Sequence, residues 1–283
     1  MEIVVDKVNR KSNGEMILEN ISFKASPGNV VGILGPGESG KTSLLRILIN
    51  ILKPDSGSIK FDGKRINASV LNSIGYLPEE RGLYQKKHVI EVMVYFGRLK
   101  NMPLKKAQVE AIRLLDRHEM IEYMDKPVGQ LSRGLQQKLL FIIAILHDPQ
   151  LLILDEPFRG IEPLSQDMLQ KLIFRYRDES KTVIVATRQF NQAEKVCDEI
   201  LFLNKGKTLL KGNLEKIQEK YPFHLIRVEA DGDLRLLKEI PGVEKFYTEK
   251  QTAKLFVDEK IPPAEILDKI IGRVNVSSLE VNR

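Results

Sequence analysis

The chain lacks the residues and segments that mark a disulfide-stabilised or membrane-spanning protein. Its 283 residues contain one cysteine, Cys197, and no tryptophan. A single thiol cannot form a disulfide within the chain, which is typical of proteins in a reducing cytoplasm. The longest apolar runs, such as residues 139–146, end after about eight residues, whereas a membrane-spanning helix needs roughly twenty. We therefore expect no segment of this chain to cross a membrane.

The N-terminus and the net charge exclude few further classes of protein. Residues 1–6 contain no basic segment followed by an apolar one, so they do not resemble a secretory signal. Lysine and arginine number 44 against 38 acidic residues, a net charge of +6, but the two signs are interleaved along the chain. Such an excess suits a surface near anionic lipid head groups as well as one that binds a nucleic acid, so charge alone does not identify a partner.

One glycine-rich segment carries the clearest chemical signal. It fits the pattern G-x-x-x-x-G-K-[ST], follows the apolar run 29–34 and precedes apolar residues at helical spacing. Such a turn directs backbone N–H groups at one anion, and the following helix adds its positive dipole end. We predict a nucleotide phosphate site, with Lys41 at the β- and γ-phosphates and the Thr42 hydroxyl on Mg²⁺. The predicted cofactor-binding residues of this loop are Gly35, Pro36, Gly37, Glu38, Ser39, Gly40, Lys41, Thr42 and Ser43.

The apolar pattern predicts an α/β domain around this loop. Residues 151–154 and 182–186 are continuous apolar runs, as expected for central strands of a parallel sheet that is covered on both faces. Helical spacing in residues 164–177 and 189–199 supplies the crossovers that parallel strands require. Alternation near the N-terminus predicts antiparallel strands, and the pattern from residue 89 to about residue 147 predicts a helical insertion.

A second, smaller domain is predicted after Tyr221-Pro222, where the α/β pattern ends. The remaining residues, 222–283, have the mixed periodicity of a small α+β domain. Its expected elements are a strand over residues 224–229, a helix over 234–239, strands near 245–248 and 254–257, a helix over 263–271 and a strand over 274–279.

Two further segments place polar groups at the ends of elements that can face the phosphates. Residues 131–138 put a serine and a glycine at the start of a long apolar helix, whose free N–H groups attract an anion. Residues 151–157 form a buried strand that ends in two carboxylates. We predict that Asp155 holds Mg²⁺ through water and that Glu156 polarises an attacking water.

With these three segments in this order and spacing, residues 1–220 resemble the ATP-binding subunit of ABC transporters. The glycine loop corresponds to Walker A, residues 131–136 to the signature and residues 151–155 to Walker B. The resemblance implies the P-loop NTPase fold of ABC ATPases, with a mostly parallel core sheet, antiparallel N-terminal strands and a helical subdomain at about 85–147. Residues 74–84 resemble the loop that senses the γ-phosphate and contacts the membrane subunit, which makes Glu79 a candidate ligand of Mg²⁺ and ATP. The form of this loop and the extra C-terminal domain look most like subunits of exporters.

The resemblance also implies partners and cofactors. In the family, ATP and Mg²⁺ lie between Walker A of one chain and the signature of a second chain in a head-to-tail dimer. Ser132, Arg133 and Gly134 are therefore candidate nucleotide contacts from the partner side. The implied partners are a separately encoded integral membrane subunit and a second ATP-binding chain, identical or different, at the cytoplasmic face of the membrane. No nucleic acid is expected, because ABC ATPases that act on DNA or ribosomes usually carry two cassettes or a long coiled-coil insertion.

Several positions depart from the family pattern at the expected site. Thr187-Arg188 stands where the family usually has a histidine, and arginine is permanently charged and accepts no hydrogen bond. The D-loop carries Glu162 at the expected dimer interface, with one methylene more than the usual aspartate, and Arg133 and Leu135 depart from the signature. Three alternatives follow: a transport ATPase with Glu156 and Arg188 as its catalytic residues, a hydrolysis-impaired regulatory subunit that pairs with a competent chain, and a soluble ABC ATPase outside transport.

Overall fold

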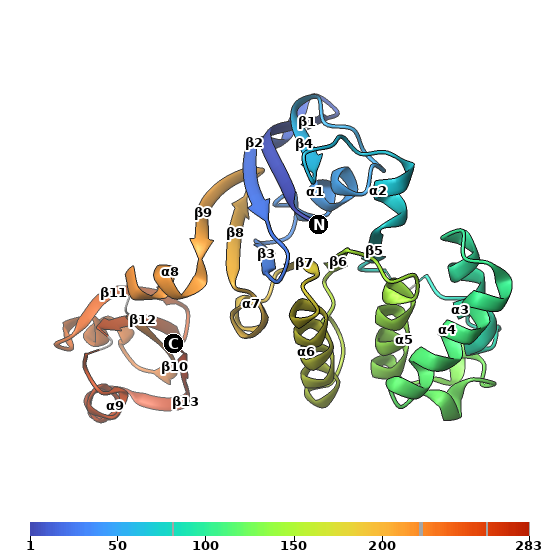
Figure 1. The fold of residues 1–283 in the computed structure, drawn as a ribbon. Coiled ribbons are helices and arrows are strands. Elements are labelled where there is room, and N and C mark those ends of the chain that lie inside the picture. Colours follow the sequence, from blue (N-terminus) through green and yellow to red (C-terminus); the bar gives the residue numbers. More distant parts are fainter. Residues whose placement is uncertain (81, 221–222, 259, 283) are drawn as a thin grey trace. The chain divides into compact units, whose positions relative to one another are not determined.

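The computed structural model describes residues 1–80, 82–220, 223–258 and 260–282. They form two compact units, residues 1–214 and 215–283, which Figure 1 colours along the chain. The predicted boundary at Tyr221-Pro222 lies outside the described residues. Among the helices of the described ranges, none is long and apolar enough to cross a membrane.

A six-stranded, mostly parallel sheet forms the centre of the first unit, which confirms the predicted α/β class. Its strands are β3 (Val30–Leu34), β5 (Ile74–Leu77), β6 (Leu151–Asp155), β7 (Thr182–Thr187), β8 (Glu199–Asn204) and β9 (Lys207–Asn213). They lie in the order β5-β6-β7-β3-β8-β9, and β9 alone among these strands runs antiparallel to its neighbour. Every residue of β3, β6 and β7 is buried, which explains their continuous apolar sequence. The carboxyl ends of these three strands therefore meet at one edge of the sheet.

Three strands of this sheet correct the expectations from sequence. Residues 74–77, expected within a loop, form β5 beside β6. The helix expected over residues 189–199 ends early, because α7 spans Phe190–Val196 and β8 begins at Glu199. The Asp198 carboxylate accepts a hydrogen bond from the Val30 amide (2.7 Å), which ties the chain to the start of β3 and brings β8 alongside it. β8 and β9, where no strand is expected, extend the sheet beyond β3.

The N-terminal strands form a separate antiparallel sheet, as predicted. Its strands are β1 (Ile3–Ser12), β2 (Glu15–Ala25) and β4 (Ser56–Phe61), in the order β2-β1-β4. Helix α1 (Lys41–Leu48) buries Leu44, Leu45 and Leu48 in a core cluster that also contains side chains of both sheets. This packing fixes the start of α1, and with it the glycine loop, against two sheets (Figure 1).

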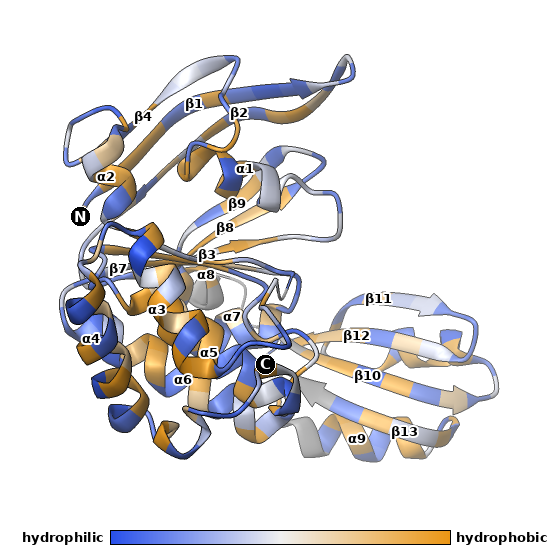
Figure 2. Cartoon of the chain, turned by 90° about the vertical axis from the view of Figure 1, so that its right-hand side faces the viewer, coloured by the Kyte–Doolittle hydropathy of each residue, from blue (hydrophilic) through white to orange (hydrophobic). Residues whose placement is uncertain are grey.

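The expected helical insertion is present, but the buried face of one of its helices differs from the apolar pattern. Its elements are α3 (Val89–Leu99), α4 (Leu104–Arg117), two 3-10 turns, η1 (Ile121–Tyr123) and η2 (Val128–Gln130), and α5 (Arg133–Ile145), whereas the short helix α2 (Ala68–Asn72) precedes β5. In α4, Val109 and Ile112 are 63% and 45% exposed, whereas Ala107 is buried. The small alanine allows α3 to pack closely, since a Cβ on Gly97 would lie 3.1 Å from Ala107 Cβ. Figure 2 shows apolar residues concentrated on α3 and α5. The next helix, α6 (Pro163–Asp178), follows strand β6 in the chain.

The second unit is a four-stranded antiparallel sheet with its own apolar core. Its elements are α8 (Leu214–Lys220, which begins at the boundary), β10 (Phe223–Asp231), η3 (Leu234–Glu239), β11 (Val243–Glu249), β12 (Thr252–Asp258), α9 (Pro263–Ile271) and β13 (Asn275–Asn282). The strand order is β11-β12-β10-β13, the arrangement of a β-α-β-β-α-β unit. The helix expected over residues 234–239 is a 3-10 helix, which still buries Leu234 and Leu237 in the core.

Candidate nucleotide-binding site

The glycine loop between β3 and α1 has a backbone that two of its glycines make possible. Gly35 has φ +152°, and a Cβ there would lie 2.1 Å from the Leu203 carbonyl oxygen. Gly40 has φ +99°, and its Cβ would lie 2.8 Å from the Ile17 carbonyl oxygen. Another residue at either position would force the loop away from its neighbours. The close approach explains why this segment forms a tight cradle at the carboxyl end of β3.

The Lys41 side chain lies inside this cradle. Its Nζ donates hydrogen bonds to the carbonyl oxygens of Gly35 (2.7 Å) and Pro36 (2.8 Å), and the side chain is buried. Burial lowers the pKa of Lys41, an effect that the nearby Glu156 carboxylate opposes. A phosphate placed against the loop would favour the charged ammonium in the same way, so the predicted role of Lys41 fits its position.

A cavity of about 670 Å³ opens over the loop. Residues 36–43 line it, together with Glu156 and Arg188, and this volume is typical of a pocket for a small-molecule ligand. The sequence analysis missed the residues of β1–β2 and β8–β9 that complete the wall, which are Glu15, Met16, Ile17, Asn204, Lys205 and Gly206. The one sequence feature that could have revealed them is Asn204-Lys205-Gly206, which is typical of a hairpin turn and predicts the β8–β9 hairpin.

Asp155 ends β6 with its carboxylate buried beside the phosphate loop. Among the described residues, neither carboxylate oxygen accepts a hydrogen bond, and the side chain is 1% exposed. Burial raises the pKa of Asp155 to about 6, with Glu79 and Glu156 adding to the shift, while the Thr42 hydroxyl, which is close but lacks hydrogen-bond geometry, opposes it. Buried oxygens without donors are suited to a hard cation, so Asp155 and Thr42 fit the predicted Mg²⁺.

The protein side chains alone do not complete a metal site. No group of three or more His, Cys, Asp or Glu residues within the described ranges is arranged to hold a metal ion. Mg²⁺ commonly takes one or two protein carboxylates and fills its coordination with water and nucleotide phosphates. The few ligands at Asp155 and Thr42 therefore match a cation that arrives with a nucleotide.

Glu156 follows Asp155 and is held by the end of the neighbouring strand β7. It has φ +48°, and its Oε2 accepts hydrogen bonds from Thr187 Oγ1 (3.1 Å) and from the Arg188 amide (3.3 Å). The side chain is 6% exposed and lines the nucleotide cavity. Two donors and burial fix the carboxylate in one position, as a general base requires.

Arg188 forms ion pairs with both Glu156 and Glu79, and the sequence did not predict either contact. Its Nε lies 3.3 Å from Glu156 Oε1, and a terminal nitrogen lies 3.4 Å from Glu79 Oε1. Arg159 also pairs with Glu79. The Arg188 guanidinium therefore contacts the candidate base and also lines the nucleotide cavity. Arg81 of the predicted sensing loop lies outside the described residues.

The signature residues lie at the start of α5 and do not line the nucleotide cavity. Ser132 is the N-cap of α5, and its Oγ accepts a hydrogen bond from the Leu135 amide (3.2 Å). A Cβ on Gly134 would lie 2.2 Å from Ser165 Oγ, so the glycine allows α5 to pack closely on the start of α6. Arg133 and Glu162 likewise lie outside the cavity, at the first position of α5 and the N-cap of α6.

Comparison with known proteins places this geometry in a family. A sequence model of the ABC transporter family matches residues 18–159, the segment that contains the glycine loop, the signature and both carboxylates. The chain belongs to the ABC transporter ATP-binding proteins. This confirms the resemblance, and the chain is an ATP-binding subunit of the ABC ATPase family.

Individual relatives extend the match along the chain. An uncharacterised ABC transporter ATP-binding protein of Bacillus subtilis, YhaQ, is 31% identical over 279 residues, which cover 99% of this chain and 94% of that protein. The Nod factor export ATP-binding protein I of a Rhizobium species is 28% identical over 277 residues, covering 96% and 90%. The structure of cbiO1 from Clostridium perfringens, described as part of the transporter complex cbiONQ, superposes with a TM-score of 0.70 at 27% identity, covering 77% and 90%. The alignment with YhaQ also includes most of residues 215–283, so the similarity extends into the C-terminal unit.

Proposed function

We propose that the chain hydrolyses ATP with Mg²⁺ in a head-to-tail dimer and so drives export through a separately encoded membrane subunit. The observation that carries this proposal is the position of Glu156, which is held by β7 and lines the same cavity as the phosphate loop. Lys41 would bind the β- and γ-phosphates, and Thr42, Asp155 and Glu79 would hold Mg²⁺, directly or through water. Mg²⁺ would neutralise charge on the phosphates, while Glu156 would orient and deprotonate the attacking water.

We propose a dimer because the signature residues of one chain do not line the nucleotide cavity of that chain. Ser132, Arg133 and Gly134 lie at the start of α5, and none of them lines the cavity. A helix N-terminus carries free N–H groups and a partial positive charge that favour a phosphate. A second chain would bring these groups to the phosphates, with Glu162 near the same interface. That chain would be identical or a different ATP-binding subunit.

Export is proposed from the name of one relative and from a surface suited to a partner. The rhizobial relative is named for Nod factor export, and cbiO1 is described as part of a multi-chain transporter. In this chain an apolar groove of about 490 Å³ lies between β5 and the helices α3 and α5. Its lining includes Tyr76, Phe96, Leu99 and Leu140. We propose that a cytoplasmic segment of the membrane subunit binds there, at the cytoplasmic face of the membrane.

Replacing Leu99 with glutamate should remove the membrane partner and leave ATP binding unchanged. Leu99 is 58% exposed and lines the groove, so the substitution puts a charge into the proposed contact with little cost to folding. The tagged chain is purified from membranes of its own organism, and the integral proteins that accompany it are identified. Leu104→Glu is the matched control, because Leu104 is 52% exposed on α4 and does not line the groove.

Co-purification of one integral protein with the unmodified chain and with Leu104→Glu, but not with Leu99→Glu, supports the transport proposal. If no integral protein accompanies the unmodified chain, the soluble, non-transport alternative is favoured instead. Equal recovery with Leu99→Glu would contradict the groove as the contact, although not the transporter itself.

The ion pair between Arg188 and Glu156 favours the second alternative, a subunit with impaired hydrolysis. A guanidinium that pairs with the base carboxylate competes with a water molecule for the same oxygen. Arg188→His should therefore raise the rate of ATP hydrolysis about two- to fivefold, because a half-exposed ion pair is worth at most about 1 kcal/mol. Phosphate release is measured with Arg159→His as control, which alters a pairing of Glu79 without touching Glu156. An unchanged or lower rate in Arg188→His would show that this pair does not limit hydrolysis.

A further inference from the structure

A second cavity of the first unit lies away from the phosphate loop. Its volume is about 300 Å³, and its lining comes from α4, from α6 and from residues at the end of α5. It shares no lining residue with the nucleotide cavity. Leu114, Phe141 and Leu172 give it a buried apolar wall, and much of the rest of the lining is charged. Such a lining can hold a small ligand that has both an apolar body and a charged group.

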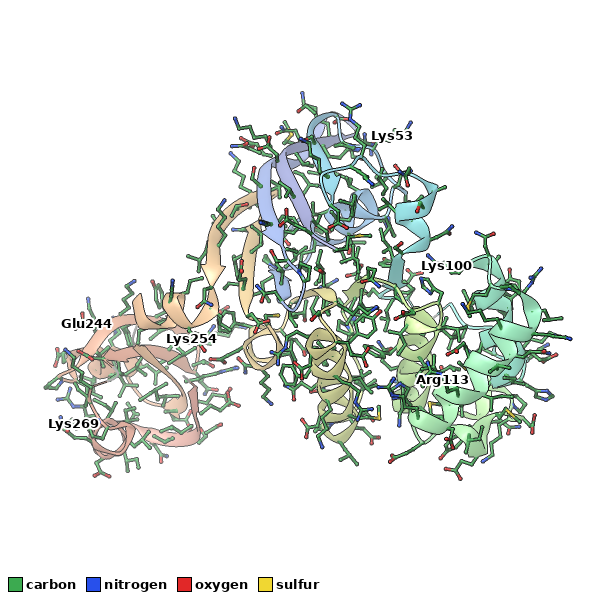
Figure 3. The ribbon with its side chains drawn as sticks, in the orientation of Figure 1. Lys53, Lys100, Arg113, Glu244, Lys254 and Lys269 are labelled. Carbon is green, nitrogen blue, oxygen red and sulfur yellow. The ribbon has the colours of Figure 1, made fainter. Side chains whose placement is uncertain are left out.

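The carboxylates of this cavity are already paired with cations. Arg113, which Figure 3 labels, comes from α4 and donates from Nε to the carboxylate of Glu110. The three pairs are Arg113 with Glu110 (2.7 Å), Arg117 with Glu179 (3.2 Å) and Lys181 with Asp148 (2.9 Å). Because each acid has its own basic partner, none of these acids neutralises the remaining basic residues of the lining.

Two of those basic residues, Lys106 of α4 and Arg175 of α6, have exposed side chains that line the cavity. Neither makes a side-chain hydrogen bond or an ion pair with another described residue. Arginine binds the two oxygens of a carboxylate or phosphate through its planar fork, and lysine adds a second positive charge. The rim of the cavity therefore offers donors for an anionic group.

His118, at the end of α4, is a third polar residue of the lining. The side chain is 6% exposed, and its buried Nε2 has no hydrogen-bond partner among the described residues. Burial, together with the charges of Arg117 and Arg175, lowers the pKa of His118 to about 4, so the imidazole is neutral at pH 7. The neutral ring adds no charge of its own, and the cations around it favour a negatively charged ligand in this cavity.

We propose that this cavity binds a small organic anion. Its carboxylate or phosphate would contact Arg175 and Lys106, and its apolar body would pack against Leu114, Phe141 and Leu172. The limited volume suits a ligand with one ring or a short chain. A bound ligand would contact α5 and α6, the two helices whose first turns carry the residues of the expected dimer interface.

Binding is tested by titration calorimetry on the full chain with phenyl phosphate and with benzoate as probes. Saturating Mg²⁺ and ADP are present throughout, so that the phosphate loop is already filled. We expect one molecule of at least one probe to bind per chain, inorganic phosphate to bind at least about tenfold more weakly, and neutral benzyl alcohol not to bind. The tighter of the two aromatic probes identifies the head group as phosphate or carboxylate.

Arg175→Gln should weaken binding of that probe about ten- to a hundredfold, because it removes a charge-assisted hydrogen bond. Lys106→Gln should act in the same direction, whereas Lys105→Gln, on the same helix but outside the lining, should leave the affinity unchanged. All three side chains are exposed, and the unfolding midpoint of each variant shows that the fold is intact. The proposal is overturned if neither aromatic probe binds the unmodified chain, or if Arg175→Gln and Lys106→Gln bind as tightly as Lys105→Gln.

Discussion

Glu156→Gln should lower the rate of ATP hydrolysis about a hundred- to a thousandfold, because it removes a general base, and it should leave ATP binding intact. Glutamine has nearly the same shape as glutamate, and its amide oxygen can still accept hydrogen bonds from the Thr187 hydroxyl and the Arg188 amide. It cannot accept a proton from water. The nucleotide would therefore stay bound between two chains that cannot release it by hydrolysis.

This prediction is checked by phosphate release and by the oligomeric state in ATP and Mg²⁺. We expect Glu156→Gln to form an ATP-dependent dimer that persists, whereas the unmodified chain dimerises only transiently. Glu19→Gln is the control, since Glu19 makes a surface pair with Lys207 (3.1 Å) outside the cavity and its loss should change the rate little. Equal rates in Glu156→Gln and the unmodified chain would refute hydrolysis by this site.

The glycine loop and the two carboxylates, which the structure places near one another, can be located from local sequence alone. The glycine loop is recognised from the strand before it, the helix after it and its glycines, two of which have neighbours that leave no room for a Cβ. Asp155 and Glu156 follow directly from a strand so apolar that it must be central. The structure adds that β6 and β3 are parallel strands separated by β7, so that their carboxyl ends bring both carboxylates to the loop.

The parts that were missed depend on contacts between distant residues. A helix over residues 189–199 is consistent with local periodicity, but the hydrogen bond from the Val30 amide to Asp198 ends it and starts a strand. Position 188 departs from the family pattern, yet nothing near it in sequence indicates that its guanidinium contacts Glu156, the residue after β6. Val109 and Ile112 of α4 are exposed, because α3 packs closely against the face of α4 that carries Ala107.

Two variants that are each inactive should restore hydrolysis when they are mixed, if each ATP site is shared between two chains. Lys41→Ala removes the buried ammonium from the phosphate loop and should lower the rate at least about a hundredfold. Ser132→Asp keeps an N-cap that can accept from the Leu135 amide, but it places a negative charge where a partner's phosphate is expected. Ser132→Asn keeps the same cap without the charge and is the matched control, with a rate much closer to that of the unmodified chain.

In a mixed dimer, the Lys41→Ala chain supplies an intact signature to the intact phosphate loop of the Ser132→Asp chain. One site of such a dimer is complete, and the other carries both substitutions. Random association of equal amounts makes half of the dimers mixed, so sites that work independently should give about a quarter of the unmodified rate. Phosphate release is measured for each variant alone and for the mixture at the same total concentration. A mixture no faster than its components would mean that two copies of this chain do not share a site, since a site within one chain could not be repaired by the other.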